Sequence, residues 1–153
     1  MSGIGQKQFK QGKYNPINKS KYIGKGSPIY RSGWELKCFL TLDKNPAVIK
    51  WGSENVILPY VDPTRNHTVH QYIVDLFFEA YDPNGNIVRY LVEVKPFKET
   101  QPPKISARKK QETIAYETIT YARNCAKWQS AIKFARSKGW KFLIWTEKQL
   151  IIK

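Results

Sequence analysis

The most informative pattern in the chain lies over residues 72–96. Two runs of β-branched and aromatic residues there flank the polar turn sequence of residues 82–86, Asp-Pro-Asn-Gly-Asn. Such a pattern is typical of a β-hairpin. Pro83 suits the first corner of a type I turn, and Gly85 supplies the left-handed residue that follows it. The sequence therefore predicts a three-residue hairpin loop closed by a β-bulge.

This loop also predicts how the two strands of the hairpin pair. Cross-strand partners keep a constant sum of residue numbers, so Asp75 faces Glu93, and Glu79 faces Arg89. The second pair joins opposite charges, which favours this register. A two-residue loop would shift the pairing by one residue and put Asp75 and Glu93 on opposite faces of the sheet.

The remaining hydrophobic pattern predicts an α/β fold. The expected elements, in chain order, are a helix over residues 32 to about 44, strands at 48–51 and 56–60, the hairpin, helices from 105 to about 121 and from 124 to 138, a strand at 140–145 and a short helix from 146. This order suits a mixed central β-sheet that contains an antiparallel hairpin and is flanked by helices.

The chain carries a strong excess of positive charge. Its 153 residues include 26 Lys and Arg against 12 Asp and Glu, a formal net charge of +14. This excess favours nucleic acid over a membrane as partner, because no amphipathic or apolar membrane segment and no signal peptide is visible. A ribosome-like or merely basic soluble protein is the alternative. Cys38 and Cys125 are far apart, which predicts reduced core thiols in a cytosolic protein.

Residues 1–31 concentrate this charge. They contain seven Lys or Arg and no acid, and six of the nine glycines precede Trp34. We expect a flexible arm here, because such a segment buries too little apolar surface to become ordered. Residues 32–153 are expected to form a single domain. Four aromatic residues of the arm either stack on bases or a partner, or belong to a solvated tail: Phe9, Tyr14, Tyr22 and Tyr30.

Asp75, Glu93 and Lys95 are the candidate catalytic residues. All three are expected on one patch of sheet, in strands that are apolar on both faces and therefore covered on both. Burying such charges without partners is costly, and neighbouring carboxylates repel each other. A divalent cation resolves both problems, and carboxylate oxygens suit Mg²⁺. Lys95 would stand beside the metal, where it positions a water or neutralises charge that develops on a phosphate.

Asp75 on one strand and Glu93-Val-Lys95 on the next resemble the PD-(D/E)XK nuclease superfamily, with Val74 where the motif's name has Pro. Across almost its whole length the chain also looks like the head-completion nucleases of T-even-type tailed phages, a group similar to the TnsA transposon-end nucleases. The stretches that carry this closer resemblance are residues 30–35 (YRSGWE), 50–54 (KWGSE), 93–98 (EVKPFK) and 139–142 (GWKF).

The resemblance implies a restriction-endonuclease-like α/β sandwich and a Mg²⁺-dependent DNA endonuclease, with Mn²⁺ able to substitute. By that resemblance Asp75, Glu93 and the main-chain carbonyl of Val94 bind the metal, and Lys95 assists the attacking water. It also implies action in phage head completion after DNA packaging, with capsid or portal and neck proteins as partners. The expected location is the host cytoplasm during phage assembly, and the virion.

Glu35 has two explanations at the level of sequence. Ser32 and Glu35 have the spacing of a capping box, which by itself accounts for an acid at this position. The family resemblance instead places an acid on this helix facing the metal. Glu35 would then be a catalytic residue and a metal ligand. The sequence leaves both explanations open.

Basic residues outside the catalytic group are candidates for contacting DNA. Several lie at or just before the start of the helix expected from residue 105, where cations oppose the helix dipole, so helix stability does not explain them. Phosphate contact explains them, and a solvated basic face is the alternative. The candidate DNA-binding residues are Arg31, Lys98, Lys104, Arg108, Lys109, Lys110 and Lys127.

Two other functions are compatible with parts of the pattern. One is a non-catalytic DNA-binding capsid or portal component with a relic nuclease fold, and the intact Asp, Glu and Lys set argues against it. The other is a restriction or junction-resolving enzyme. The sequence shows no separate recognition domain, which weakens sequence-specific restriction and leaves branch specificity open. His67 and His70 form a His-x-x-His pair without a Cys or carboxylate at zinc-ligand spacing.

Overall fold

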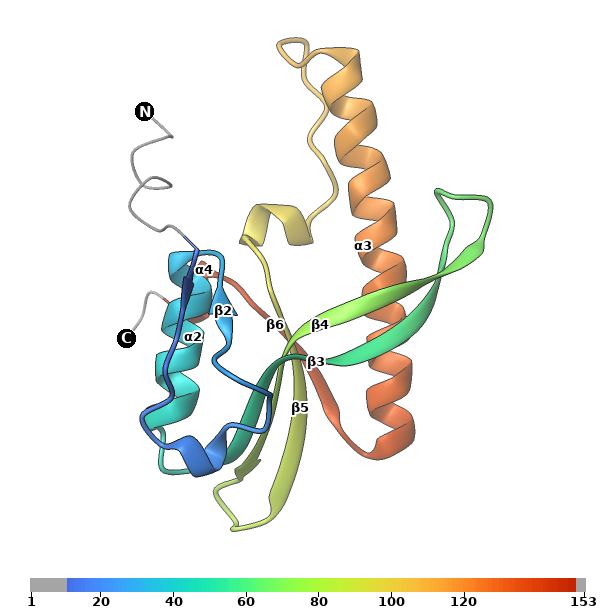
Figure 1. Cartoon of the computed structure of the whole chain (residues 1–153). Helices are drawn as coiled ribbons and strands as arrows, with labels where there is room; N and C mark the ends of the chain where they lie inside the picture. The colour runs from blue at the N-terminus through green and yellow to red at the C-terminus, as the bar shows by residue number, and fades with distance from the viewer. Residues whose placement is uncertain (1–10, 151–153) are drawn as a thin grey trace.

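A four-stranded mixed sheet forms the centre of the molecule, seen in a computed structural model that describes residues 11–150. Its strands, in spatial order, are β3 (Val48–Asp62), β4 (Thr68–Tyr81), β5 (Ile87–Val94) and β6 (Lys141–Trp145). β4 pairs antiparallel with β3 and β5, whereas β6 lies parallel to β5 (Figure 1). The predicted mixed sheet is confirmed.

Helices cover both faces of this sheet. On one face α2 (Gly33–Lys44) contributes Phe39 to a core around Trp51. On the other face α3 (Gln111–Lys138) contributes Trp128 to a second core. Figure 1 shows the sheet between these two helices. The predicted α/β sandwich is confirmed, because each apolar face of the sheet is buried by a helix.

The β4–β5 hairpin has the predicted loop and register. Gly85 has a φ of 82°, and its N–H donates to the Asp82 carbonyl at 2.9 Å. Glu79 pairs with Arg89 in the ladder, and Arg89 Nε lies 2.7 Å from Glu79 Oε2. Local turn chemistry therefore specifies how these two strands pair.

β3 is one strand of 15 residues where the sequence predicts two short ones. The turn-forming residues 52–55 do not end the strand. They form a β-bulge, because the pairing with β4 shifts between Ser53 and Val56 and Glu54 adopts a φ of 54°. A bulge absorbs an extra residue and bends the strand. The outer halves of β3 and β4 curl across α3 (Figure 1).

α3 is a single helix of 28 residues, so the two helices predicted on either side of residues 121–124 are one. That stretch contains no Pro or Gly to end a helix. The helix begins at Gln111, so Arg108 and Lys109 lie in the turn before it and not in its first turns. Gly139 ends it in the left-handed conformation, as predicted.

The last helix, α4 (Glu147–Leu150), is capped as predicted. The Oε1 atom of Gln149 accepts from the Thr146 N–H at 2.7 Å. The Thr146 hydroxyl oxygen in turn accepts from the Lys148 N–H at 3.1 Å. The Gln149 side chain therefore makes its bond of the capping box, and the Thr146 hydroxyl caps the N–H of Lys148, one position before Gln149.

Residues 11–31 pack against the rest of the fold, which contradicts their prediction as part of a flexible arm. They contain β1 (Gly12–Lys13), η1 (Lys19–Lys21) and β2 (Ile29–Tyr30). Tyr14 is 8% exposed, and its hydroxyl donates to Oδ2 of the buried Asp43 at 2.5 Å. The N–H groups of Ile17 and Asn18 donate to the same carboxylate at 2.7 and 3.0 Å.

A buried carboxylate explains why this segment is ordered despite its composition. One Asp side chain accepts several hydrogen bonds at once, and an unpaired buried charge would be costly. The prediction counted apolar surface and missed this polar anchor. Residues 1–10 of the predicted arm lie outside the described residues.

Tyr14→Phe tests the docking of residues 11–31. We expect it to lower the free energy of unfolding by about 1.5–3 kcal/mol, because it removes a hydrogen bond to a charged group and keeps the ring. Urea denaturation of both proteins measures the difference. Tyr116→Phe is the matched control, since the Tyr116 side chain is exposed. Wild-type stability of Tyr14→Phe would show that the segment does not depend on Asp43.

Both cysteines are free thiols, as predicted, with Cys38 buried and Cys125 half-buried. Burial raises the pKa of the Cys38 thiol to about 12, and the negative charges of Asp75 and Glu35 add to this effect. The Cys38 thiol therefore stays protonated. Within residues 11–150 no helix is long and apolar enough to cross a bilayer.

Candidate active site

Strands β4 and β5 separate at the residues predicted to be catalytic. Their backbone pairing extends in the predicted register as far as Leu76 and Val92. Beyond it the Asp75 side chain replaces the backbone as acceptor, because its Oδ2 accepts from the Val94 N–H at 2.8 Å. The Asp75 carboxylate therefore lies against β5, close to the segment that carries Glu93.

At Asp75 the two faces of β4 exchange the cores that they contact. Val74 packs in the core under α3, whereas Leu76 packs in the core under α2. Strand alternation would put these two residues on the same face. The sharp twist between them brings the Asp75 carboxylate to the edge where the two layers meet.

Glu93 is 6% exposed, and both of its carboxylate oxygens have a partner. The Tyr72 hydroxyl donates to Oε1 at 2.5 Å, and Lys95 Nζ lies 3.3 Å from Oε2. The backbone of this segment is held by β6, since the Lys95 N–H donates to the Trp145 carbonyl at 3.0 Å. The parallel strand therefore fixes the direction in which Glu93 and Lys95 project.

Tyr72 is a site residue that the sequence reasoning missed. Burial raises the pKa of its hydroxyl, and the negative charge of Glu93 adds to the effect, so Tyr72 stays protonated and donates. Alternation along β4 places Tyr72 and Asp75 on opposite faces. The pattern of the sequence therefore held no signal that Tyr72 contacts the partner carboxylate.

The carboxylates of Asp75 and Glu93 carry like charges that repel each other. Burial, and then the negative charge of Glu93, raise the pKa of Asp75 to about 7, against the Val94 N–H and the Lys95 ammonium. A cation beside both carboxylates would remove this conflict. Within residues 11–150, no three acidic, His or Cys side chains gather closely enough to hold an ion. Two carboxylates with waters and a substrate phosphate are a donor set that fits Mg²⁺.

Glu35 stands at the start of α2 in a modified capping box. Ser32 Oγ accepts from the Glu35 N–H at 3.1 Å, and Glu35 Oε1 accepts from the Arg31 N–H at 2.8 Å, not from Ser32. The carboxylate also lines a pocket together with Asp75. The other residues that line this pocket are Phe39, Ser53, Glu54 and Leu76. Glu35 therefore both caps α2 and lies beside the predicted metal site.

Glu54 is a second pocket residue that the sequence reasoning did not select. It occupies the bulge of β3 with a φ of 54°, and its Oε2 lies 2.8 Å from Arg31 Nη1. A left-handed conformation at a residue with a side chain costs on the order of 1 kcal/mol or more and persists where the surroundings impose it. The turn-forming sequence around Glu54 signals a bend. The sequence does not predict where this bend lies in the fold, because its position at the pocket depends on the pairing of β3 with β4.

Two of the predicted DNA-binding cations lie near the carboxylates. Arg31 lies beside the pocket, paired with Glu54. Lys127 projects from α3, with its Nζ 5.7 Å and 5.8 Å from the ring centroids of Tyr60 and Tyr72. Burial lowers the pKa of Lys127, whereas the negative charge of Glu93 raises it.

The other predicted cations lie in the segment that joins β5 to α3. Lys98 belongs to η2 (Phe97–Thr100), and Lys104, Arg108, Lys109 and Lys110 follow. Lys109 Nζ lies 2.8 Å from Glu117 Oε1 and donates to the Lys104 carbonyl at 2.9 Å, so its charge is already paired. Figure 1 shows this segment rising with the first turns of α3 beyond the sheet.

Comparison with known proteins identifies the family of the chain. A family model described as TnsA-like endonuclease N terminal matches residues 45–147, which include Asp75, Glu93 and Lys95 but not Glu35. The Head completion nuclease of Enterobacteria phage T4 is 39% identical over 145 residues, which cover 91% of this chain and 92% of the phage protein. Both comparisons confirm the predicted resemblance. The chain belongs to the TnsA-like endonuclease family.

Proposed function

We propose that the chain is a Mg²⁺-dependent DNA endonuclease that hydrolyses phosphodiester bonds and acts in phage head completion after DNA packaging. The observation that carries this proposal is the meeting of the half-buried Asp75 carboxylate and the buried Glu93 carboxylate with Lys95 at the split between β4 and β5. Membership of an endonuclease family supports the reaction. The name of the phage T4 relative supports the role in head completion.

Asp75, Glu93 and the main-chain carbonyl of Val94 would hold the metal. A bound Mg²⁺ supplies Lewis-acid polarisation of the phosphate and a water of lowered pKa. The Val94 N–H orients the Asp75 carboxylate and the Tyr72 hydroxyl orients the Glu93 carboxylate, so both are positioned before the ion binds.

Lys95 acts on the water and the phosphate. Its ammonium, 3.3 Å from Glu93, can orient the attacking water and neutralise charge that develops on the phosphate oxygens. The water oxygen loses a proton to solvent and forms a bond to phosphorus, as the bond from phosphorus to the leaving sugar oxygen breaks and that oxygen takes up a proton from solvent. Glu35, in the same pocket as Asp75, completes or orients the site as a charged group.

DNA is the proposed substrate, and the cations nearest the carboxylates are its proposed contacts. Arg31 and Lys127 would contact phosphates beside the scissile bond. The remaining candidates would contact DNA at the segment that joins β5 to α3, namely Lys98, Lys104, Arg108, Lys109 and Lys110. A partner among capsid or portal and neck proteins, and a location in the host cytoplasm and the virion, follow from the proposed role in head completion.

Incubation of the purified protein with linear and branched DNA tests this function. We expect cleavage with Mg²⁺ or Mn²⁺, no cleavage with EDTA, and recovery when Mg²⁺ is added in excess, because two carboxylates without a cation cannot activate water for attack on phosphate. Product lengths on denaturing gels measure the cuts. DNA binding without cleavage in either ion would support a non-catalytic capsid component. Cleavage confined to branched DNA would support a junction-resolving enzyme.

A further inference from the structure

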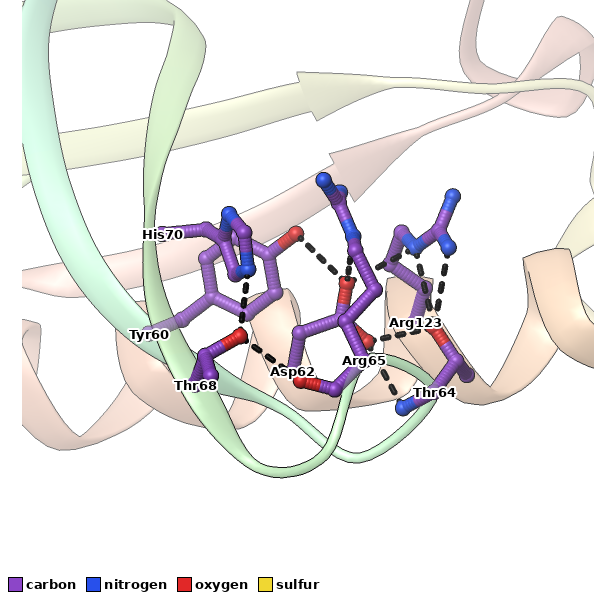
Figure 2. A network of polar contacts seen from close by, with 7 residues as sticks. All are labelled: Tyr60, Asp62, Thr64, Arg65, Thr68, His70 and Arg123. Carbon is purple, nitrogen blue, oxygen red and sulfur yellow. Dashed lines mark hydrogen bonds and ion pairs between the residues drawn. The ribbon is translucent and has the colours of Figure 1, made fainter.

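Asp62 is a buried carboxylate at the end of β3, toward the tip of the β3–β4 hairpin. It has no exposed surface, and it accepts from the Thr64 N–H at 2.8 Å and from the Thr64 hydroxyl at 2.6 Å. Figure 2 shows Asp62 at the centre of a polar network whose other side includes Tyr60 and His70. Such partners are required, because burying an unpaired charge is costly.

Two arginines share one oxygen of Asp62. Its Oδ2 lies 2.8 Å from Arg65 Nε and 2.9 Å from Arg123 Nε. Arg123 reaches this atom from α3, across 61 residues of sequence. In Figure 2 the outer nitrogens of Arg65 point away from Asp62, whereas one outer nitrogen of Arg123, Nη2, donates to the Thr64 hydroxyl oxygen at 2.9 Å. The side chains of Arg65 and Arg123 are 47% and 31% exposed, so both can be reached from solvent.

The pair of arginines carries more charge than Asp62 can balance. Burial alone raises the pKa of Asp62, but hydrogen bonds from Thr64 and the two guanidinium groups outweigh burial and hold that pKa well below its usual range. Asp62 therefore stays ionised and balances one arginine. The ion pair between Arg123 and Asp62 is enough to hold the β3–β4 hairpin against α3. The second, half-exposed arginine leaves a net positive charge, and fixed guanidinium groups match the geometry of phosphate oxygens.

This pair continues a row of cations that begins at the active site. Lys127 lies one helical turn after Arg123 on α3. Burial lowers the pKa of Lys127, Glu93 opposes this effect, and the positive charges of Lys95, Arg123 and Arg65 add to it. Lys127 Nζ lies 5.7 Å and 5.8 Å from the ring centroids of Tyr60 and Tyr72. The Tyr60 hydroxyl donates to Asp62 and the Tyr72 hydroxyl donates to Glu93, so Lys127 lies between the hairpin tip and the carboxylates.

The distance from the active-site carboxylates to the two arginines matches the length of a short DNA segment. Tyr72, which holds Glu93, pairs with Leu58 on β3. Asp62 lies roughly 13 Å farther along β3, at about 3.3 Å per residue. This distance corresponds to about four base pairs of duplex at 3.4 Å each. A DNA strand held in the active site would therefore reach the two arginines a few nucleotides from the cut.

We infer that Arg65 and Arg123, oriented by Asp62, form a clamp for the DNA backbone a few nucleotides from the cleaved bond. This inference rests on the proposed nuclease function and assigns a second point of attachment to its substrate. Asp62 is a positioning residue, since it acts through the two arginines. We call this pair the arginine clamp.

Arg65→Gln, Arg123→Gln and the double variant test the arginine clamp. Binding to a short duplex is measured by fluorescence anisotropy in EDTA over a series of salt concentrations. Each replacement is expected to reduce the slope of log affinity against log salt by about one unit, and the pair by about two, on unrelated sequences alike. With Mg²⁺ the variants should raise KM and leave kcat unchanged, because the clamp binds substrate away from the reacting atoms.

Arg89→Gln is the matched control. Arg89 Nε also lies against a single carboxylate, at 2.7 Å from Glu79, and its side chain is 46% exposed, close to the value for Arg65. The β4–β5 loop near Arg89 lies at the opposite end of the molecule from the β3–β4 tip (Figure 1). A slope that is unchanged in the Arg65 and Arg123 variants, or that falls equally in Arg89→Gln, overturns the clamp.

Asp62→Asn separates positioning from charge. The variant raises the net charge by one, so charge alone predicts tighter DNA binding. The arginine clamp predicts weaker binding, because the two guanidinium groups lose their shared anchor. Tighter binding by a folded Asp62→Asn protein would overturn the role of Asp62. If this variant does not fold, Arg65→Gln decides, since Asp62 there keeps Thr64 and Arg123 as partners.

The wild-type protein distinguishes failure of the clamp from failure of the proposed function. A wild-type protein that neither binds nor cleaves DNA contradicts the nuclease proposal. A wild-type protein that cleaves DNA with Mg²⁺, while Arg65→Gln and Arg123→Gln keep the wild-type salt slope, contradicts only the clamp.

Discussion

Asp75→Asn is expected to abolish DNA cleavage and to leave DNA binding intact or stronger. The loss of one charged metal ligand should reduce kcat by roughly three orders of magnitude or more, which is about 4 kcal/mol. Binding persists because no phosphate-contacting cation is lost and one negative charge is removed. The Asn oxygen can still accept from the Val94 N–H, which holds Asp75 at 2.8 Å in the wild type, so the fold should survive.

Single-turnover cleavage with Mg²⁺ and anisotropy in EDTA measure the two properties on one preparation. Glu93→Gln is expected to behave like Asp75→Asn, since both carboxylates lie at the same split between strands. Glu79→Gln is the matched control for Glu93→Gln, because Glu79 is 7% exposed against 6% for Glu93 but pairs with Arg89 away from the site. Wild-type cleavage rates in Asp75→Asn or Glu93→Gln would remove that residue from the active site.

Glu35→Gln is expected to reduce cleavage by orders of magnitude at an unchanged melting temperature. The carboxylate of Glu35 accepts from the Arg31 N–H at 2.8 Å, a bond that Gln can also accept, so the start of α2 should keep its cap. Gln lacks the negative charge that a group beside the metal site must supply. Cleavage assays across Mg²⁺ concentrations and thermal unfolding measure the two effects separately.

Ser32→Ala is the control for the Glu35 experiment. Its hydroxyl accepts from the Glu35 N–H at 3.1 Å, so removing it should lower stability by about 1 kcal/mol while the charges of the active site remain. A Glu35→Gln protein that cuts DNA at the wild-type rate over the whole Mg²⁺ range would confine the site to Asp75, Glu93 and Lys95. Glu35 would then be only a capping residue.

The parts of this protein that were predictable from sequence are those set by neighbouring residues. The loop at Gly85 determines the register of the β4–β5 hairpin, and that register brings Asp75 toward Glu93. The caps at Ser32 and Thr146 likewise depend on side chains that reach backbone groups two to four residues away. Turn geometry and strand period act over a few residues, so the sequence carries them directly.

Contacts between distant segments were decided only by the tertiary structure. Asp43 orders residues 11–31 through bonds to Tyr14, and Asp62 joins Arg65 to an arginine of α3. Neither carboxylate stands in a motif. Their hydrogen bonds gain strength only when packing removes water from both partners, and that desolvation depends on segments tens of residues apart. The twist of β4 at Asp75 was also not predictable from sequence. Strand alternation predicts which residues share a face of the sheet, but it does not predict how far the strand rotates along its length.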